Sequence, residues 1–390
     1  MYSLLLAIIY LSFISLGLPD SLLGSAWPVM RFEFGAGLSF AGFISMLICG
    51  CTIISSLASD FLTRKFGAGR VTAVSVAMTA IALLGFSMAD SLVLLCILAI
   101  PYGLGAGAVD AALNNYVALH FAARHMSWLH CFWGVGASIS PYIMSACLAV
   151  DNNWRGGYLT VSVIQIVLTV CLFATLPLWK KMQTAESAAE ERAEPVGVIG
   201  ALKIPGVPFI LLAFLAYCGL EATTSLWASS YLVEFRGSDP ETAARYASLF
   251  YLGLTGGRLL NGFLADRFSD RTLIRVGSII MLSGMVLLML PIPSVIPAAA
   301  GLLIIGLGCA PVYPCIIHST PANFGAKNSQ AIIGIQMASA YVGSTLVPPV
   351  FGLIADFVSV SWYPFWLAAF TVLQIAMTER LNALFKGKNG

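Results

Sequence analysis

The sequence predicts an all-α membrane protein in which twelve transmembrane helices form two pseudo-symmetric six-helix bundles. Its 390 residues are 59% hydrophobic and only 10% charged, whereas soluble domains carry about 25% charged residues. Apolar segments long enough to cross a bilayer core, about 20 residues each, recur along the whole chain. One extended polar stretch, from Lys180 to Pro205, divides these segments into two sets of six.

The twelve segments follow one another with short connections. In the first half they cover residues 3–29, 38–60, 71–89, 91–119, 127–149 and 157–179, and in the second half 207–233, 243–265, 273–291, 295–318, 329–355 and 361–384. The first run lacks a basic start and continues to Trp27, which is too long for the apolar core of a signal peptide, so we assign it as a spanning helix. The predicted organisation is an N-terminal bundle of residues 1–180, a cytoplasmic linker of residues 181–205 and a C-terminal bundle of residues 206–390. The prolines of the tenth and eleventh segments, Pro311, Pro314, Pro348 and Pro349, break the hydrogen-bond ladder, and a static kink or a flexing point is expected there.

The distribution of lysine and arginine predicts the orientation. Most of the 20 basic residues fall in loops on the side that carries both termini, and the loops on the other side hold Arg31, Arg155, Arg236 and Arg245. Because loops rich in lysine and arginine stay in the cytoplasm, both termini are expected there. We expect a monomeric integral protein of a bacterial inner (plasma) membrane.

The composition argues against several other classes of protein. The net charge of +2 comes without a basic patch interleaved with aromatic residues, so no nucleic-acid partner is expected. The nine cysteines lack metal-ligand spacing, and we interpret them as apolar packing residues. The sequence has no evident nucleophile–base arrangement and no GxxxxGK[ST] loop for ATP. We therefore expect neither an enzyme nor an ATP-driven protein, and no metal or cofactor.

Two short repeats relate the two halves. The fourth segment contains GLGAGAVD from Gly103, and the tenth contains GLGCAPVY from Gly306. The fifth contains VGASISP from Val135, and the eleventh contains VGSTLVP from Val342, in the same order and at nearly the same separation. With six spans per half, such repeats have parallel topology and are related by an axis along the membrane normal.

Asp110 lies near the middle of the apolar run of residues 91–121, and Asn114 follows one helical turn later on the same face. A carboxylate at the centre of a membrane helix costs about 2.5–3.5 kcal/mol, so its side chain is expected to face protein or water. The glycines within residues 103–107 allow a neighbouring backbone to approach closely. Two interpretations are open: a structural aspartate tied to another helix, or a proton or substrate site in a transport path.

Two further acidic residues lie within predicted spans. Asp20 follows Pro19, where the first helix is expected to bend, and it could equally make a cap or a contact between helices. Glu221 has Tyr217 and Ser225 one turn to either side, which makes a polar stripe on an apolar helix. A carboxylic acid in a partly dry cavity favours its neutral form, which provides a physical route for coupling a proton to a cargo.

The stretch GGRLLNGFLADRF, from Gly256, resembles the loop motif of the major facilitator superfamily, in which glycine is followed after three residues by Asp-Arg. The first-half counterpart, SSLASDFLTRKFGAGR from Ser55, is degenerate and lacks that Asp-Arg pair. The resemblance implies the superfamily fold over the whole chain. It also implies gating contacts at the positions that match the motif, namely Asp60, Arg64, Lys65, Gly67, Gly262, Asp266 and Arg267.

Within the superfamily, four stretches are similar to the fucose-permease group of sugar/proton symporters. They are LGLPDSLLGSAWP from Leu16, the segment around Asp110, WLHCFWGVGASISP from Trp128 and YCGLEATTSLWASSYL from Tyr217. The resemblance implies a secondary active transporter that imports a sugar or sugar-like small solute together with a proton by alternating access. Its partners would be the lipid bilayer and a small-molecule substrate, expected to be a sugar, with the proton as coupling ion.

The candidate residues fall into three groups. Proton coupling is assigned to Asp110, Asp20 and Glu221, with Asp110 favoured. Hydrogen-bonding groups and flat aromatic surfaces suit a sugar ring, and the candidate binding residues of this kind are Asn114, Asn115, His130, Trp133, Glu221, Trp227, Tyr313 and Gln336. A local hydrogen bond and a proton relay are both open for His130. Arg258, a basic residue deep in a span, could pair with an acid, hold an anionic cargo or belong to the gate, and we assign it to the gating group.

Two rival functions remain open. The run GVGASISP in the fifth segment partly resembles the antiporter motif of drug exporters, but Ser140-Pro141 is followed by Tyr142 in place of the expected ending. A proton antiporter that exports a drug or metabolite is therefore the alternative. A membrane sensor that binds cargo without transporting it is the remote alternative.

Overall fold

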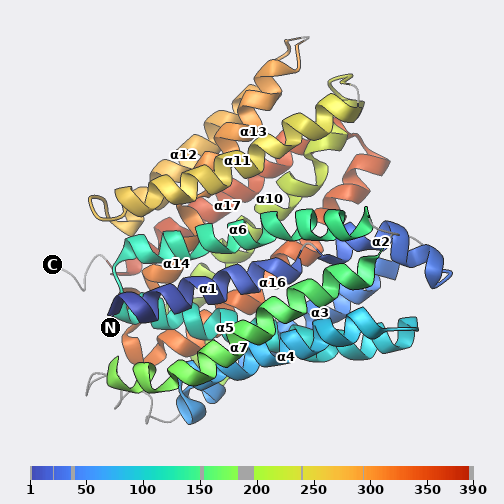
Figure 1. Ribbon diagram of the computed structural model, residues 1–390. Coiled ribbons are helices and arrows are strands. Elements are labelled where there is room, and N and C mark those ends of the chain that lie inside the picture. Colours follow the sequence, from blue (N-terminus) through green and yellow to red (C-terminus); the bar gives the residue numbers. More distant parts are fainter. Residues whose placement is uncertain are drawn as a thin grey trace. The chain divides into compact units, whose positions relative to one another are not determined.

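The computed structural model describes residues 2–20, 22–36, 40–149, 153–182, 197–238, 240–292 and 294–385. Every regular element among these residues is helical (Figure 1). Residues 183–196 of the predicted linker lie outside the described residues.

The described residues of the first half of the chain form seven helices. They are α1 (Tyr2–Asp20), α2 (Leu22–Glu33), α3 (Phe40–Phe66), α4 (Ala68–Met88), α5 (Leu92–His120), α6 (Ala123–Leu148) and α7 (Trp154–Met182). The first predicted span comprises α1 and α2, on either side of residue 21, which lies outside the described residues, and Leu4–Trp27 counts as one candidate membrane span. Gly67 joins α3 to α4 with a φ of 80°, a left-handed conformation that glycine adopts without strain.

The second half begins with the short α9 (Gly197–Leu202). It continues with α10 (Val207–Glu234), α11 (Pro240–Leu264), α12 (Asp270–Met289), α13 (Ile296–Cys309), α14 (Val312–His318), α15 (Thr320–Phe324), α16 (Ala326–Phe357), the 3-10 turn η1 (Val360–Trp362) and α17 (Tyr363–Phe385). The tenth predicted segment is interrupted between α13 and α14, as Pro311 predicts. In the eleventh, α16 instead continues through Pro348 and Pro349 without interruption.

Eleven helices in the described part of the chain are long and apolar enough to span a membrane. They begin with Leu4–Trp27 and end with Val360–Phe385, and they coincide with eleven of the twelve predicted segments. The remaining segment forms α11, which has 25 residues and carries Arg258 and Asn261 among its apolar side chains. The all-α membrane fold is therefore confirmed, with helices at all twelve predicted places.

The chain packs as two compact units. Unit 1 comprises Met1–Tyr116, Leu129–Val198 and Ala326–Ala338, and unit 2 comprises Val117–Trp128, Ile199–Gly325 and Ser339–Gly390. The first turns of α16 thus pack within unit 1, and the residues that end α5 and begin α6 pack within unit 2. The boundaries of the two bundles given above stay predictions.

Each unit is built from helices that lie side by side. In unit 1, α4 packs along α7, and Trp27, Phe86, Trp154 and Tyr158 belong to a common buried cluster (Figure 1). In unit 2, α13 packs against both α11 and α12, and α10 packs against α17 (Figure 1). Burial of large aromatic side chains gives these contacts their area.

The glycines of the sequence repeats occupy equivalent places in the two units. A Cβ on Gly103 of α5 would lie 2.2 Å from a carbonyl oxygen of α3, and one on Gly306 of α13 would lie 2.1 Å from a carbonyl oxygen of α11. Gly136 of α6 and Gly343 of α16 meet α1 and α10 in the same way, at 2.1 and 2.4 Å. Small residues let backbones approach this closely in membrane helices. In each half, the repeat glycines therefore bring the second span against the fourth (α3 and α5, α11 and α13). They also bring the first span against the fifth (α1 and α6, α10 and α16).

Candidate functional site

Three polar residues in the interior of unit 1 form a hydrogen-bonded chain. Asn114 Nδ2 donates to Asp110 Oδ1 at 2.8 Å and to the Asp110 carbonyl oxygen at 2.9 Å. Asn114 Oδ1 lies 3.1 Å from His130 Nε2. All three residues are buried. The one-turn spacing on α5 predicted the first contact, and the second joins α5 to α6.

Asn114 sets the direction of this chain. Because its Nδ2 donates to Asp110, its Oδ1 faces His130, and an amide oxygen can only accept a hydrogen bond. Nε2 of His130 therefore carries a proton in this arrangement, an assignment that rests on the hydrogen-bond network. Phe13 of α1 packs edge-on against the imidazole, with ring centroids 5.5 Å apart. The carboxylate and the imidazole are thus held in fixed orientations by one amide.

Asn115 is separated from this cluster although it is the next residue. Successive residues point about 100° apart around a helix. The Asn115 side chain accepts a hydrogen bond from Ser329 Oγ of α16 at 2.6 Å and is also buried. The structure therefore divides two asparagines that the sequence analysis grouped as binding residues.

Asp20 has different surroundings from Asp110. It ends α1, and its Oδ2 accepts a hydrogen bond from Trp133 Nε1 of α6 at 3.0 Å. Gly17 permits this approach, since a Cβ there would lie 2.2 Å from the Trp133 carbonyl oxygen. The Asp20 residue is exposed, whereas Asp110 is 6% exposed. Trp133 is thus positioned by an acid, with its indole nitrogen already engaged.

A second polar cluster lies within unit 2. Arg258 Nη2 of α11 is 3.5 Å from Glu221 Oε1 of α10, and the two side chains are 5% and 23% exposed. The Tyr217 hydroxyl lies 2.5 Å from Glu221 Oε2 and 2.9 Å from the Cys309 carbonyl oxygen. Tyr313 packs against Tyr217 with ring centroids 6.3 Å apart. Three roles were open for Arg258, and its position beside Glu221 agrees with pairing with an acid. Its assignment to the gate stays a prediction.

The remaining predicted binding residues lie elsewhere. Trp227 donates from Nε1 to the Pro348 carbonyl oxygen at 3.0 Å and packs against Phe351. Six residues separate it from Glu221, which places the two side chains about 120° apart around α10. Gln336 is fully buried in the part of α16 that belongs to unit 1. The predicted binding residues are thus distributed over both units.

The predicted gating residues Asp60 and Arg64 form a buried ion pair at the end of α3. Arg64 Nε donates to Asp60 Oδ1 at 2.7 Å, and the two side chains are 7% and 5% exposed. Arg64 Nη2 also donates to the carbonyl oxygen of Lys327, in the first turn of α16. Gln330 Nε2, one turn further, lies 3.4 Å from Ser59 Oγ. Lys65 lies in the last turn of α3 and Gly67 joins α3 to α4, and of the first-half motif residues Asp60 and Arg64 form the contact with α16.

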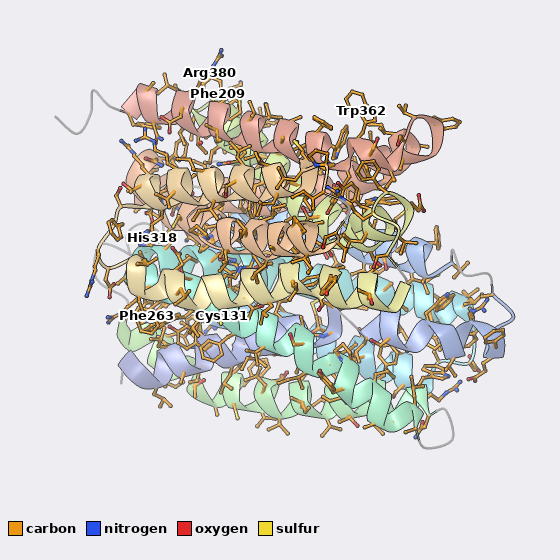
Figure 2. All side chains as sticks on the ribbon, turned by 90° about the horizontal axis from the view of Figure 1, so that it is seen from above. Cys131, Phe209, Phe263, His318, Trp362 and Arg380 are labelled. Atoms are coloured by element: carbon orange, nitrogen blue, oxygen red, sulfur yellow. The ribbon has the colours of Figure 1, made fainter. Side chains whose placement is uncertain are left out.

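In unit 2 the loop motif contacts the first turns of α6. Arg124 Nη1 lies 3.1 Å from Asp266 Oδ2, with both side chains exposed. A Cβ on Gly262 would lie 2.0 Å from Trp128 Nε1, so only glycine leaves room for this indole. Phe263, which is labelled in Figure 2, packs edge-on against Trp128 with ring centroids 5.5 Å apart. Arg267 is exposed.

Sequence reasoning missed the partners of the motif residues. These partners are Arg124, Trp128 and Lys327, and Ser329, the partner of Asn115, was missed as well. A usable signal exists for the first two, because RHMSWLH gathers polar and aromatic residues at the start of the fifth predicted segment. No comparable signal marks Ser329, since isolated serines occur throughout the apolar segments.

Comparisons with known proteins agree with this architecture. The family model described as Major Facilitator Superfamily matches residues 9–316 and 209–385. The glucose/mannose transporter GlcP of Bacillus subtilis is 24% identical over 319 residues, which is 79% of this chain and 75% of that protein. The hexuronate transporter of Bacillus subtilis is 25% identical over 249 residues, which is 60% of this chain and 56% of that protein.

A crystal structure of the E. coli fucose:proton symporter FucP has the same fold. It superposes with a TM-score of 0.79 at 15% sequence identity, and the match covers 97% of this chain and 99% of that one. The expected resemblance to fucose permease is confirmed, as is the expectation of a transporter and not an enzyme. On the family match, the helix order and the repeated glycine contacts, the chain belongs to the major facilitator superfamily.

Proposed function

We propose that this protein imports a sugar or sugar-like small solute together with a proton, by alternating access. The observation that carries the proposal is the buried chain of Asp110, Asn114 and His130 in unit 1. An ionisable carboxyl group inside a membrane protein is costly and is typical of an ion or substrate pathway. The protein would act as a monomer in the inner membrane, with both termini in the cytoplasm.

The proposed coupling follows from the hydrogen bonds that Asp110 can make in its two states. The ionised carboxylate only accepts, and Asn114 supplies a donor to it. The protonated acid gains a donor of its own and loses the cost of a buried charge. A solute hydroxyl could then bond to the neutral acid, and the loaded protein could change state without moving a net charge through apolar surroundings.

Alternating access requires contacts that form in one state and break in the other. The contact of Arg64 with Asp60 and with the Lys327 carbonyl oxygen suits this role, because it joins α3 to the first turn of α16. The exposed pair of Arg124 and Asp266 is a second candidate. Both are hydrogen-bonded pairs that can separate without disturbing an apolar core.

An imposed pH gradient distinguishes import from the alternatives. Purified protein in liposomes is given an acidic outside and a panel of labelled sugars, and uptake is compared with the reverse gradient. Symport predicts accumulation with the acidic outside, and antiport predicts accumulation inside vesicles with an acidic interior. A sensor would shift the melting temperature with a solute but would show no gradient-driven uptake and no counterflow.

A second candidate cargo is a sugar acid. It is favoured by Arg258, a buried cation whose acid partner Glu221 is partly exposed and could be exchanged for a solute carboxylate. One relative is named as a hexuronate transporter. The test compares the binding of glucuronate and glucose, which differ at one carbon. A sugar-acid carrier should bind glucuronate at least about tenfold more tightly than glucose (about 1.4 kcal/mol), and a neutral-sugar carrier should bind glucose more tightly.

A further inference from the structure

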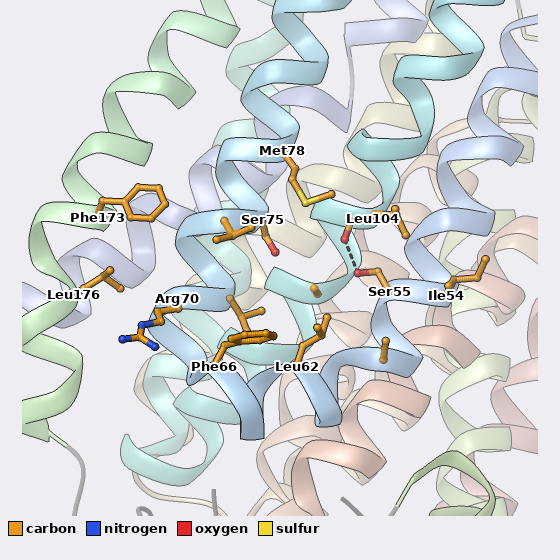
Figure 3. A pocket seen from close by; sticks show the side chains of 14 residues that line it. Ile54, Ser55, Leu62, Phe66, Arg70, Ser75, Met78, Leu104, Phe173 and Leu176 are labelled. Atoms are coloured by element: carbon orange, nitrogen blue, oxygen red, sulfur yellow. Dashed lines mark hydrogen bonds between the residues drawn. The ribbon is translucent and has the colours of Figure 1, made fainter.

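An apolar groove lies between α3, α4, α5 and α7 in unit 1 (Figure 3). Its volume is about 520 Å³, and Leu62, Met78 and Phe173 are among the side chains that line it. Pockets that hold small organic molecules measure about 300–1,000 Å³. Ser55 on its wall already donates to the Leu104 carbonyl oxygen, as the dashed line in Figure 3 shows. The groove therefore offers mainly apolar contact.

The groove adjoins a basic pocket at the turn between α3 and α4. This second cavity, of about 260 Å³, is lined by Arg64, Lys65 and Arg70. Phe66, Arg70 and Leu176 line both cavities, which makes them neighbours. Figure 3 shows the Arg70 guanidinium at the edge of the groove, beside Leu176 and Phe66. One continuous site thus has an apolar part and a cationic part.

Two of the three cations are available to a ligand. Arg64 is engaged by Asp60 and by the Lys327 carbonyl oxygen. Arg70 is exposed and has no carboxylate partner within the described ranges. Lys65 is exposed, and its ammonium lies over two phenylalanine rings at 5.3 and 5.4 Å. The pocket therefore carries positive charge that the described protein groups leave uncompensated.

Trp179 forms part of the wall of the basic pocket. Its side chain lines the basic pocket and the residue is only 5% exposed. Its indole Nε1 has no hydrogen-bond acceptor among the residues that the structure describes. Gly69 lets the ring pack at this place, since a Cβ there would lie 2.6 Å from the indole.

We propose that this site binds one anionic phospholipid, with the headgroup phosphate on Arg70 and Lys65 and an acyl chain in the groove. The charge selects the occupant, because arginine binds phosphate in a forked geometry and basic pockets at the ends of membrane helices attract anionic headgroups. The groove selects a ligand with a long apolar tail. A free phosphate would contact only the basic pocket. A zwitterionic lipid has no net negative charge, so its attraction to Arg70 and Lys65 would be weaker.

Native mass spectrometry of the delipidated full-length protein tests the proposal. Phosphatidylglycerol and phosphatidylcholine with identical acyl chains are added in turn, and the lipid-bound fraction is measured. The wild-type protein should retain phosphatidylglycerol at least about tenfold more tightly (about 1.4 kcal/mol), and the preference should weaken at higher salt. Equal retention of the two lipids would overturn the proposal.

Variants locate the site. The double variant Lys65→Gln/Arg70→Gln should lose the preference for phosphatidylglycerol. The control Lys203→Gln/Arg380→Gln removes the same charge at two exposed residues that do not line these cavities, and it should keep the preference. If both double variants behave alike, the site is elsewhere and the proposal is wrong.

A third arm separates a lipid from a free anion. Ala58→Phe places a bulky side chain in the groove and leaves the basic pocket unchanged. It should reduce retention of phosphatidylglycerol, and millimolar inorganic phosphate should not displace the lipid from the wild type. Displacement by phosphate, together with full retention in Ala58→Phe, would show an anion site only and contradict the lipid assignment. The melting temperature of each variant confirms that it is folded.

Discussion

The two polar clusters in this transporter give their carboxylates different kinds of partner. In unit 1 the Asp110 carboxylate is bonded by the neutral amide of Asn114, which in turn faces His130. In unit 2 the Glu221 carboxylate faces the guanidinium of Arg258 and the hydroxyl of Tyr217. The amide of Asn114 donates a hydrogen bond but carries no charge, whereas the guanidinium of Arg258 brings a positive charge to its carboxylate partner.

The difference separates two tasks. An acid held by an amide can gain and lose a proton with only a local change in hydrogen bonding, which suits coupling. An acid paired with arginine has a cation beside it, which suits either packing or the exchange of one carboxylate for another. The glycine contacts show that the surrounding helices are packed alike in the two halves. The halves therefore share a scaffold and differ in the chemistry placed on it.

The largest expected effect is on stability when Arg258 is replaced by methionine. The change leaves Glu221 without its cation, and breaking a buried ion pair from one side costs about 3–5 kcal/mol. We expect the lower end of that range because Glu221 is partly exposed. The measurement is unfolding in a detergent titration.

The control is the double variant Arg258→Met/Glu221→Leu, which removes both charges. It should recover most of the lost stability, since an apolar pair of similar volume is often as stable as an ion pair. A single variant as stable as the wild type would mean that the pair is not part of the packing of unit 2.

The next effect tests whether the two halves share a scaffold. Gly136→Ala and Gly343→Ala each place a Cβ against a carbonyl oxygen of the first helix of the half, at 2.1 and 2.4 Å. Overpacking of this kind costs about 1–3 kcal/mol. Gly50→Ala is the matched control, because nothing lies within 4 Å of its Cβ, and alanine there should be neutral or stabilising. Melting temperatures would contradict the shared scaffold if only one half responded.

A smaller effect distinguishes the two predicted gating pairs. Arg124→Gln removes an exposed ion pair with Asp266, and such pairs contribute about 0.2–1 kcal/mol. Its effect on thermal stability should be small and should vanish at high salt. Arg64→Gln leaves the buried Asp60 unpaired and should cost clearly more. Equal effects would remove the distinction between buried and exposed contacts.

The smallest effect concerns pH and a pair outside the spans. Burial raises the pKa of Glu33, but hydrogen bonds from Trp154 and Arg155 and the charge of Arg155 outweigh it, so the pKa lies below its usual range. A carboxyl group with a lowered pKa stabilises the folded protein above its unfolded pKa, about 4.3. This contribution is lost as the pH falls through the folded value. Melting temperatures from pH 7 down to pH 3 should therefore fall less steeply in Glu33→Gln than in the wild type.

Much of the fold could be predicted because its signals are local. Apolar length predicts each span, and the glycines of the repeats predict where backbones meet. The contact of Asp110 with Asn114 could be predicted as well, since both lie on one helix at one-turn spacing. Pro348 and Pro349 lie inside α16, and the kink or flexing point expected there stays a prediction.

The rest of the candidate site depends on how helices are rotated against each other. Asn114 and Asn115 are adjacent in the sequence, but their side chains point about 100° apart around α5. Asn114 therefore contacts His130, and Asn115 contacts Ser329 of α16. The partner of Arg258 could not be chosen from the sequence, because several acids lie in other spans. Trp227 is a residue type that suits a sugar site, but its indole nitrogen donates a hydrogen bond to the Pro348 carbonyl oxygen.

The most direct test of proton coupling through Asp110 is proton uptake measured together with solute uptake in liposomes. With a transported solute found by the sugar panel, the wild type should alkalinise the outer medium as solute enters. Asp110→Asn should retain solute exchange without a gradient but lose the proton signal and gradient-driven accumulation by at least about tenfold. If Asp110→Asn moves protons and solute as the wild type does, Asp110 is a structural residue and the coupling proposed here is wrong.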